Sequence, residues 1–128
     1  MGRNPLQRAE QVTVKTPEAT NWPRIAACYD LLIEAQPSPV AELNRAVAIA
    51  MSEGPQRGLE LIEGIMESGK LGSYHLAHSA RADFLRQLDR REESIAAYER
   101  ALSLCHQGPE QAFLRKRISE LTAASERQ

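Results

Sequence analysis

The chain has 128 residues and a mass of 14.3 kDa, which suits one domain with a single modest core. Sixteen Lys and Arg residues against seventeen Asp and Glu give a formal net charge of -1, and this balance argues against a domain that coats nucleic-acid phosphates, because such binding needs a basic excess. The longest apolar run, residues 46–51, is much too short to cross a bilayer, and the first residues lack the apolar segment of a secretory signal, so we expect a soluble, cytoplasmic protein without membrane contact.

Residues 1–20 form the least defined part of the chain. Their sequence fits either a short helix over residues 5–13 or a solvated leader, since β-branched residues and a proline follow. Helical spacing of apolar residues begins after Asn21, a suitable N-cap, and Pro23 fits the first turn because no intrahelical N–H bond is lost there. The predicted apolar face of this helix is Ile25, Cys28, Tyr29 and Leu32.

Prolines and glycines divide the next stretch into two helices. Pro37 ends the first helix, and Ser38 can cap the second with Pro39 at its first position. Gly54-Pro55 ends the second helix and begins the third, after which two glycines mark a loop. The predicted apolar positions are Leu43, Ala46, Val47, Ala50 and Met51 on the second helix, and Leu59, Ile62, Ile65 and Met66 on the third.

Three further helices complete the predicted chain. A fourth spans residues 74–88 with Ser73 as its candidate cap, and a fifth begins after Asp89, which forms a capping-box-like pair with Glu92. Gly108-Pro109 separates the fifth helix from a sixth. The predicted inward residues are Ala77, Ala80, Phe84, Leu85 and Leu88 on the fourth, Ile95, Tyr98, Ala101, Leu102 and Cys105 on the fifth, and Leu114, Ile118 and Leu121 on the sixth. Sustained period-two alternation is absent, so we predict no sheet.

The predicted helices repeat with a period near 35 residues. Tyr29, Ile62 and Tyr98 hold the same place in the second helix of successive pairs, at separations of 33 and 36. Small residues also recur twelve positions apart, where the two helices of a pair must approach closely. These are Ala46 with Gly58 and Ala82 with Ser94.

These spacings predict an all-α fold, a tetratricopeptide-like helical hairpin repeat (an α-α superhelix) of about six helices. The domain spans residues 21–124 after the leader at 1–20, its last helix caps the apolar end, and a tail at 125–128 frays. A non-repeating helical bundle with evenly spaced loops is the alternative.

Several stretches together resemble one known family. They are Asn21-Trp22-Pro23-Arg24-Ile25-Ala26, Tyr29-Asp30-Leu31-Leu32, Pro37-Ser38-Pro39-Val40, Leu43-Asn44-Arg45-Ala46-Val47-Ala48, Gly54-Pro55 with Gly58-Leu59, Tyr74-His75-Leu76 with His78, Arg81-Ala82-Asp83, and Ala97-Tyr98-Glu99-Arg100-Ala101-Leu102. Over residues 21–121 the chain resembles the C-terminal, tetratricopeptide-like extension of bacterial RNA polymerase sigma factors of the sigma-70 type and extracytoplasmic-function class. It departs from the tetratricopeptide pattern in lacking a Trp-Leu-Gly-Tyr signature.

The resemblance implies a regulatory function. In that family the promoter-reading and polymerase-binding domains precede the extension, which is thought to control the factor's activity. We therefore expect a protein-protein interaction domain that contacts the sigma domains or RNA polymerase, without direct DNA binding, catalysis or a cofactor. A stand-alone adaptor unrelated to transcription is the first alternative, and a metal-binding or enzymatic module is the second.

Stacked hairpins leave a concave surface along the first helix of each pair, which is the natural place for a partner segment. In repeat register the groove-facing candidates are Leu43, Val47, Ala50 and Met51 on one helix, and Ser79, Asp83 and Arg86 on the other. The family resemblance adds a candidate polar contact set of Asn44, Arg45, His75, His78 and Arg81. Asn44 and Arg45 fit equally well as ties between adjacent helices.

Sites of other kinds are less well supported. His75 and His78 stand three apart, but Asp83 lies roughly 140° further round the helix, so the third ligand of a metal site is missing. Cys28 and Cys105 lack a CxxC spacing and are expected to be small core residues of a reducing compartment. Hydrolase and nucleotide-binding motifs are absent from the sequence. The basic run at residues 115–117 suits a solvated helix face better than a nucleic-acid contact.

Overall fold

A computed structural model describes residues 20–127 and confirms the all-α prediction. Every regular element in this part of the chain is a helix. In chain order the helices are α2 (Trp22–Ala35), α3 (Pro39–Glu53), α4 (Pro55–Glu67), α5 (His75–Gln87), α6 (Arg91–Leu104) and α7 (Gly108–Glu126). The helix considered at residues 5–13 lies outside the described residues. Across residues 20–127, no helix combines the length and the apolar character that a bilayer crossing needs.

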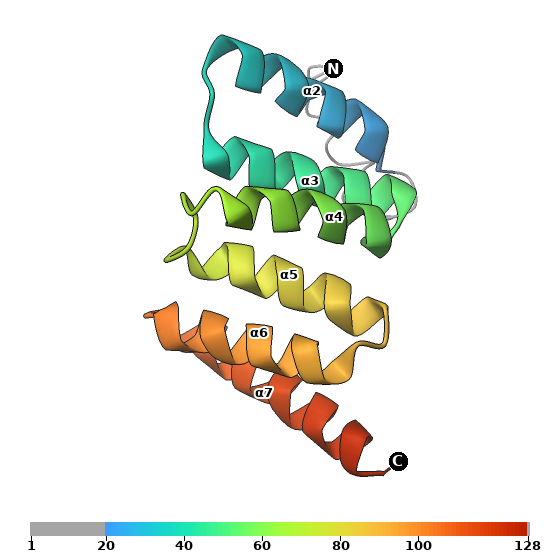
Figure 1. The fold of residues 1–128 in the computed structure, drawn as a ribbon, viewed down its shortest axis with the longest axis vertical. Helices are drawn as coiled ribbons and strands as arrows, with labels where there is room; N and C mark the ends of the chain where they lie inside the picture. Colours follow the sequence, from blue (N-terminus) through green and yellow to red (C-terminus); the bar gives the residue numbers. More distant parts are fainter. Residues whose placement is uncertain (1–19, 128) are drawn as a thin grey trace, which may run out of the picture.

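The helices follow one another along the long axis of the molecule, from α2 at one end to α7 at the other (Figure 1). Each helix makes its extensive contacts with the helices next to it in the chain. Such sequential packing in adjacent pairs is the arrangement of a helical hairpin array, in which each unit contacts only its neighbours.

Local sequence signals begin the first helices as predicted. The Asn21 side chain accepts a hydrogen bond from the Arg24 backbone N–H at 3.1 Å, and Ser38 Oγ accepts one from the Ala41 N–H at 3.3 Å. Between α3 and α4 the chain turns at Gly54, whose φ of 104° is costly for any residue with a Cβ. The caps therefore place the start of α2 and α3, and Gly54 separates α3 from α4.

Two predicted caps are wrong. Tyr74, not Ser73, precedes α5, and Arg90, not Asp89, precedes α6, so the expected pairing of Asp89 with Glu92 does not form. Asp89 instead adopts a left-handed φ of 60° after α5, a conformation that Asp tolerates better than most residues. Asp89 therefore takes part in the turn that ends α5 and does not cap α6, although its spacing to Glu92 is that of a capping box.

At the C-terminal end of the described residues, α7 is helical to Glu126, and the Arg127 backbone N–H donates to the Ala123 carbonyl. The last residue of the tail at 125–128 lies outside the described part of the chain.

The repeat is visible in where the helices begin. Pro39 and His75 start α3 and α5, 36 residues apart, and Pro55 and Arg91 start α4 and α6 with the same separation. The close approach predicted in the α5–α6 hairpin is confirmed, because buried Ser94 Oγ donates to the Ala82 carbonyl at 2.7 Å.

In the α3–α4 hairpin, Gly58 lies where space is tight. A Cβ built on Gly58 comes within 2.4 Å of Ala50 Cβ and 3.0 Å of the Phe84 ring. The hairpin depends on a small residue at position 58, as predicted.

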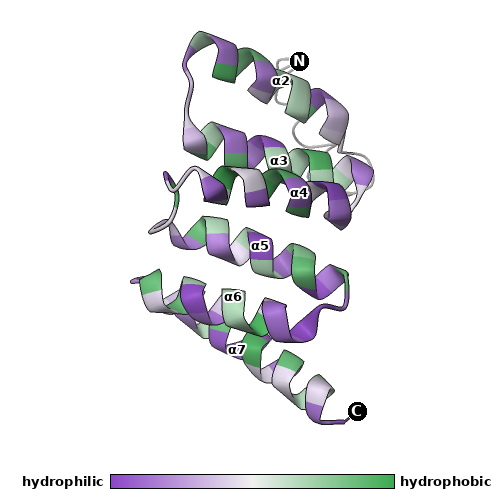
Figure 2. Cartoon of the chain, viewed as in Figure 1, coloured by the Kyte–Doolittle hydropathy of each residue, from purple (hydrophilic) through white to green (hydrophobic). Residues whose placement is uncertain are grey.

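The main core runs from α3 to α7, and a smaller cluster joins α2 to α3 and α4. The main core is Leu43, Ala50, Leu59, Ile62, Leu71, Ala77, Ala82, Phe84, Leu85, Ala97, Tyr98, Ala101, Cys105, Leu114 and Leu121. Hydrophobic and hydrophilic residues are interleaved on every helix, as expected where each helix buries only part of its surface (Figure 2). Three predicted core residues, Cys28, Leu32 and Met51, are exposed instead.

Candidate functional site

A groove of about 530 Å³ lies along α3 and α5 and reaches α6 and α7. Its walls come from four helices and the residue before α5. The lining residues are Leu43, Asn44, Val47, Tyr74, Leu76, Ser79, Ala80, Asp83, Arg86, Tyr98, Phe113 and Arg117. The first helices of both hairpins therefore face one hollow, as repeat register predicts.

One part of the groove is apolar. Val47 of α3 is partly buried against the core, whereas Leu76 of α5 and Phe113 of α7 leave 42% and 50% of their surface exposed. The Arg117 guanidinium lies over the Phe113 ring, 5.2 Å from its centroid, so a cation-π contact covers one face of the ring. Exposed large apolar side chains beside a hollow are typical of binding surfaces.

The other part of the groove is polar and centred on Asp83. Asp83 Oδ1 accepts hydrogen bonds from Arg86 Nη2 at 2.7 Å and from the Tyr98 hydroxyl at 3.3 Å, and Gln87 donates to Oδ2 at 2.9 Å. The hydrogen bond with Asp83 raises the pKa of Arg86. Burial, with the nearby Asp83 carboxylate as a second cause, raises the pKa of the Tyr98 phenol. At neutral pH Asp83 therefore bridges a fixed cation and a neutral phenol.

The structure brings six of the twelve sequence candidates together in this groove and leaves the other six outside its lining. The six are Leu43, Asn44, Val47, Ser79, Asp83 and Arg86. Ala50 is buried against Gly58, and Met51 is 53% exposed outside the groove lining. Their helical spacing matched the groove face, but the turn of α3 directs them elsewhere.

Two of the predicted polar contacts, Arg45 and Arg81, are held within the molecule. Arg45 Nε pairs with Asp30 of α2 at 2.5 Å, and Arg81 Nε pairs with Glu63 of α4 at 3.1 Å. Arg45 and Arg81 are 36 residues apart, so equivalent arginines tie each first helix to the helix before it. The interpretation of Arg45 as a tie between helices is the one that fits.

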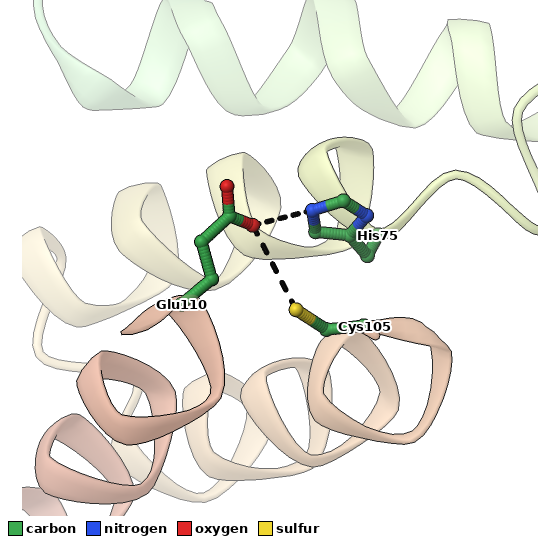
Figure 3. Close-up of side chains that lie close together, drawn as sticks. All are labelled: His75, Cys105 and Glu110. Carbon is green, nitrogen blue, oxygen red and sulfur yellow. Dashed lines mark hydrogen bonds and ion pairs between the residues drawn. The ribbon is translucent and has the colours of Figure 1, made fainter. Parts of the chain in front are cut away.

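The two histidines also separate. His78 Nε2 lies 2.9 Å from the Gly72 carbonyl oxygen, whereas His75 Nε2 lies 2.5 Å from Glu110 Oε2. His75 and His78 therefore have separate partners, and neither of these two contacts involves Asp83. His75 instead meets Cys105 and Glu110, and their ligand atoms lie within 4.8 Å of one another (Figure 3).

Sequence reasoning missed the contribution of α7 to the groove. The basic run at residues 115–117 predicts a solvated face; Arg115 and Lys116 are exposed, but Arg117 is partly buried. Arg117 Nε is buried and lacks an acceptor among residues 20–127. The one available signal was Phe113, an aromatic residue four positions before Arg117, the spacing at which helix side chains meet.

Comparisons with known proteins give one informative relative. An uncharacterized protein of Rhizobium meliloti (strain 1021) is 39% identical over 107 residues, which cover 84% of this chain and 25% of the relative. The chain therefore spans about a quarter of the length of this relative. No family model matches the chain. No solved structure matches it either.

Proposed function

We propose that this chain is a regulatory protein-protein interaction domain of a bacterial sigma factor. It would modulate transcription initiation by contacting sigma domains or RNA polymerase, and so act in the bacterial cytoplasm. The sequence resemblance over residues 21–121 supports this proposal. A relative about four times as long as the matched region fits a domain that works when joined to others.

The groove between α3 and α5 is the observation that carries the proposal. Its apolar part, with Val47, Leu76 and Phe113, suits the buried face of an amphipathic helix or extended segment. Its polar part offers charged groups to orient that segment.

The proposed mechanism is docking that biases the arrangement of the partner. A segment of the sigma domains or polymerase held in the groove favours one arrangement over another. A coupling free energy of about 1–3 kcal/mol is enough to change activity several-fold or more. Neither catalysis nor direct DNA contact forms part of the proposal.

The test is a binding measurement against the matching sigma domains and against core polymerase. Leu76→Ala and Phe113→Ala remove exposed groove side chains, so we expect each to weaken binding by about tenfold or more, as truncation of an interface anchor does. Leu31→Ala is the matched control, because Leu31 is 69% exposed and lies on α2, away from the groove lining.

Retention of neither protein at micromolar concentrations contradicts the regulatory proposal and favours the stand-alone adaptor. Equal losses from Leu76→Ala and Leu31→Ala contradict the groove as the binding surface.

A further inference from the structure

Three potential ligand side chains converge where α5, α6 and α7 meet. His75 is the first residue of α5, Cys105 directly follows α6, and Glu110 lies in the first turn of α7. Figure 3 shows the three side chains pointing toward one another from these separate elements. His75 is 30 residues from Cys105 and 35 from Glu110 in the chain, so the fold, and not a local motif, brings it to them.

We propose that His75, Cys105 and Glu110 bind a divalent transition-metal ion, with zinc as the best match. Imidazole, thiolate and carboxylate are all zinc ligands, whereas magnesium and calcium sites are built from oxygen alone. Three protein ligands leave the fourth tetrahedral position to water.

Two of the three distances between ligand atoms can be compared with tetrahedral geometry, and the third, between His75 and Cys105, is no more than 4.8 Å. Ligand atoms around one tetrahedral zinc lie about 3.3–3.6 Å apart, given zinc-ligand distances of about 2.0–2.3 Å. Cys105 Sγ is 3.7 Å from Glu110 Oε2, close to that value. His75 Nε2 is 2.5 Å from the same oxygen, so the pair must open by about 0.8 Å to admit the ion. Rotation of the half-exposed Glu110 side chain supplies this movement.

The surroundings also suit an ion. Cys105 is buried, with 2% of its surface exposed, and its thiol contacts the Gln107 carbonyl at 3.6 Å as well as Glu110. The His75 side chain is 19% exposed and the Glu110 side chain 40%, so the cluster opens to solvent on the glutamate side. That opening gives the ion an entry path.

Zinc binding would add a link between three helices. The ion would hold the start of α5 and the start of α7 to the end of α6. Tyr74, which lines the groove, packs edge-on against the His75 ring at 6.0 Å between centroids. The metal proposal is nevertheless independent of the proposed sigma-factor function, because zinc binding is measured on the chain alone.

The experiment equilibrates the purified chain with zinc chloride under a phosphine reductant, removes excess ion by desalting and measures zinc per chain. Cobalt chloride is the second probe, because a thiolate-to-cobalt charge-transfer band reports directly on cysteine ligation. We expect one zinc ion per chain, the charge-transfer band, and a higher melting temperature with zinc than with a chelator.

Matched variants assign the ligands. His75→Ala, Cys105→Ser and Glu110→Gln are each expected to weaken zinc binding by at least about tenfold. Their controls are His106→Ala, Cys28→Ser and Glu92→Gln, which change exposed residues of the same types and should leave binding intact. Helical circular dichroism checks folding, and Glu110→Gln at a half-exposed position keeps the test valid if Cys105→Ser unfolds.

The proposal is overturned if the wild-type chain retains no zinc after desalting, since the triad is then a hydrogen-bonded contact only. It is also overturned if Cys28→Ser abolishes the cobalt band while Cys105→Ser preserves it, or if zinc stabilises Glu110→Gln as much as the wild type.

Discussion

The two hairpins, α3–α4 and α5–α6, share one scaffold and differ on the face that meets the groove. Positions buried in both, each 36 residues apart, are Ala41 and Ala77, Ala46 and Ala82, Ile49 and Leu85, and Ile62 and Tyr98. On the groove face, in contrast, Leu43 and Val47 of α3 correspond to Ser79 and Asp83 of α5. Positions that pack between neighbouring helices are hydrophobic in both hairpins. Groove positions, in contrast, are apolar on α3 and polar on α5.

The largest expected effect comes from the equivalent core positions Leu85 and Ile49. Leu85 is completely buried in the main core, whereas Ile49 belongs to the small cluster with Ala26 and Ala48. Truncating a buried Leu or Ile to Ala costs about 2–5 kcal/mol, depending on how far the site can collapse. We expect Leu85→Ala near the top of this range and Ile49→Ala near the bottom, measured by urea unfolding. A larger loss of unfolding free energy for Ile49→Ala than for Leu85→Ala would contradict this expected order.

The next effect concerns the close approach of α4 to α3. Gly58→Ala places a Cβ 2.4 Å from Ala50 Cβ, and neither backbone can yield cheaply, so we expect a loss of about 1–3 kcal/mol despite the better helix propensity of Ala. Gly64→Ala in the same helix is the control, because open space surrounds its Cβ position, and it should stabilise the protein by up to about 1 kcal/mol. Denaturant midpoints of the two variants on opposite sides of the wild type would support this account; a stabilised Gly58→Ala would refute it.

The corresponding position in the second hairpin uses a hydrogen bond instead. Ser94 occupies the place of Gly58 and donates to the Ala82 carbonyl at 2.7 Å while completely buried. Ser94→Ala loses this bond but creates no clash, so we expect a loss of about 1 kcal/mol. Exposed Ser103→Ala serves as the control and should change the denaturant midpoint little. Equal midpoints for both serine variants would show that the buried bond contributes nothing.

The smallest effect appears only at high pH. Tyr98 replaces Ile62 in the second hairpin, and its raised pKa means that the folded protein holds the phenol proton more tightly than the unfolded chain does. The stabilisation of the folded state that comes from this raised pKa is therefore fully present below the unfolded pKa of about 10. It is lost as the pH rises through the folded pKa of Tyr98. We expect the free energy of unfolding of the wild type to fall more steeply in this window than that of Tyr98→Phe. Parallel pH profiles would contradict the prediction.

The helical hairpins could be predicted from the sequence because helix ends and close helix contacts depend on residues near one another in the chain. Asn21, Ser38 and Gly54-Pro55 mark helix ends within a few residues of themselves, and the small residues at 58 and 94 mark where the two helices of each hairpin approach closely. At Asp89 two local signals compete, the end of α5 and the start of α6. The residue adopts the left-handed conformation that follows α5 and does not cap α6. Apolar periodicity likewise could not place Cys28, because it does not reveal whether a partner helix covers that face.

The candidate site was only partly predictable for the same reason. Val47 and Asp83 followed from the repeat register, since equivalent helices face one hollow. Phe113 and Arg117 come from α7, whose crossing over the end of the array is set by packing and not by the repeat. His75 lies 30 residues before Cys105 and 35 before Glu110, so only the fold brings it to the other two members of the cluster.

The most direct test of the central claim, that the groove across the two hairpins receives a partner, is hydrogen-deuterium exchange with and without the matching sigma domains. The account predicts slower exchange around Val47, Asp83 and Phe113, with no change around Leu31 on α2. Slower exchange on α2 alone, with the α3 and α5 groove segments unaffected, would contradict it.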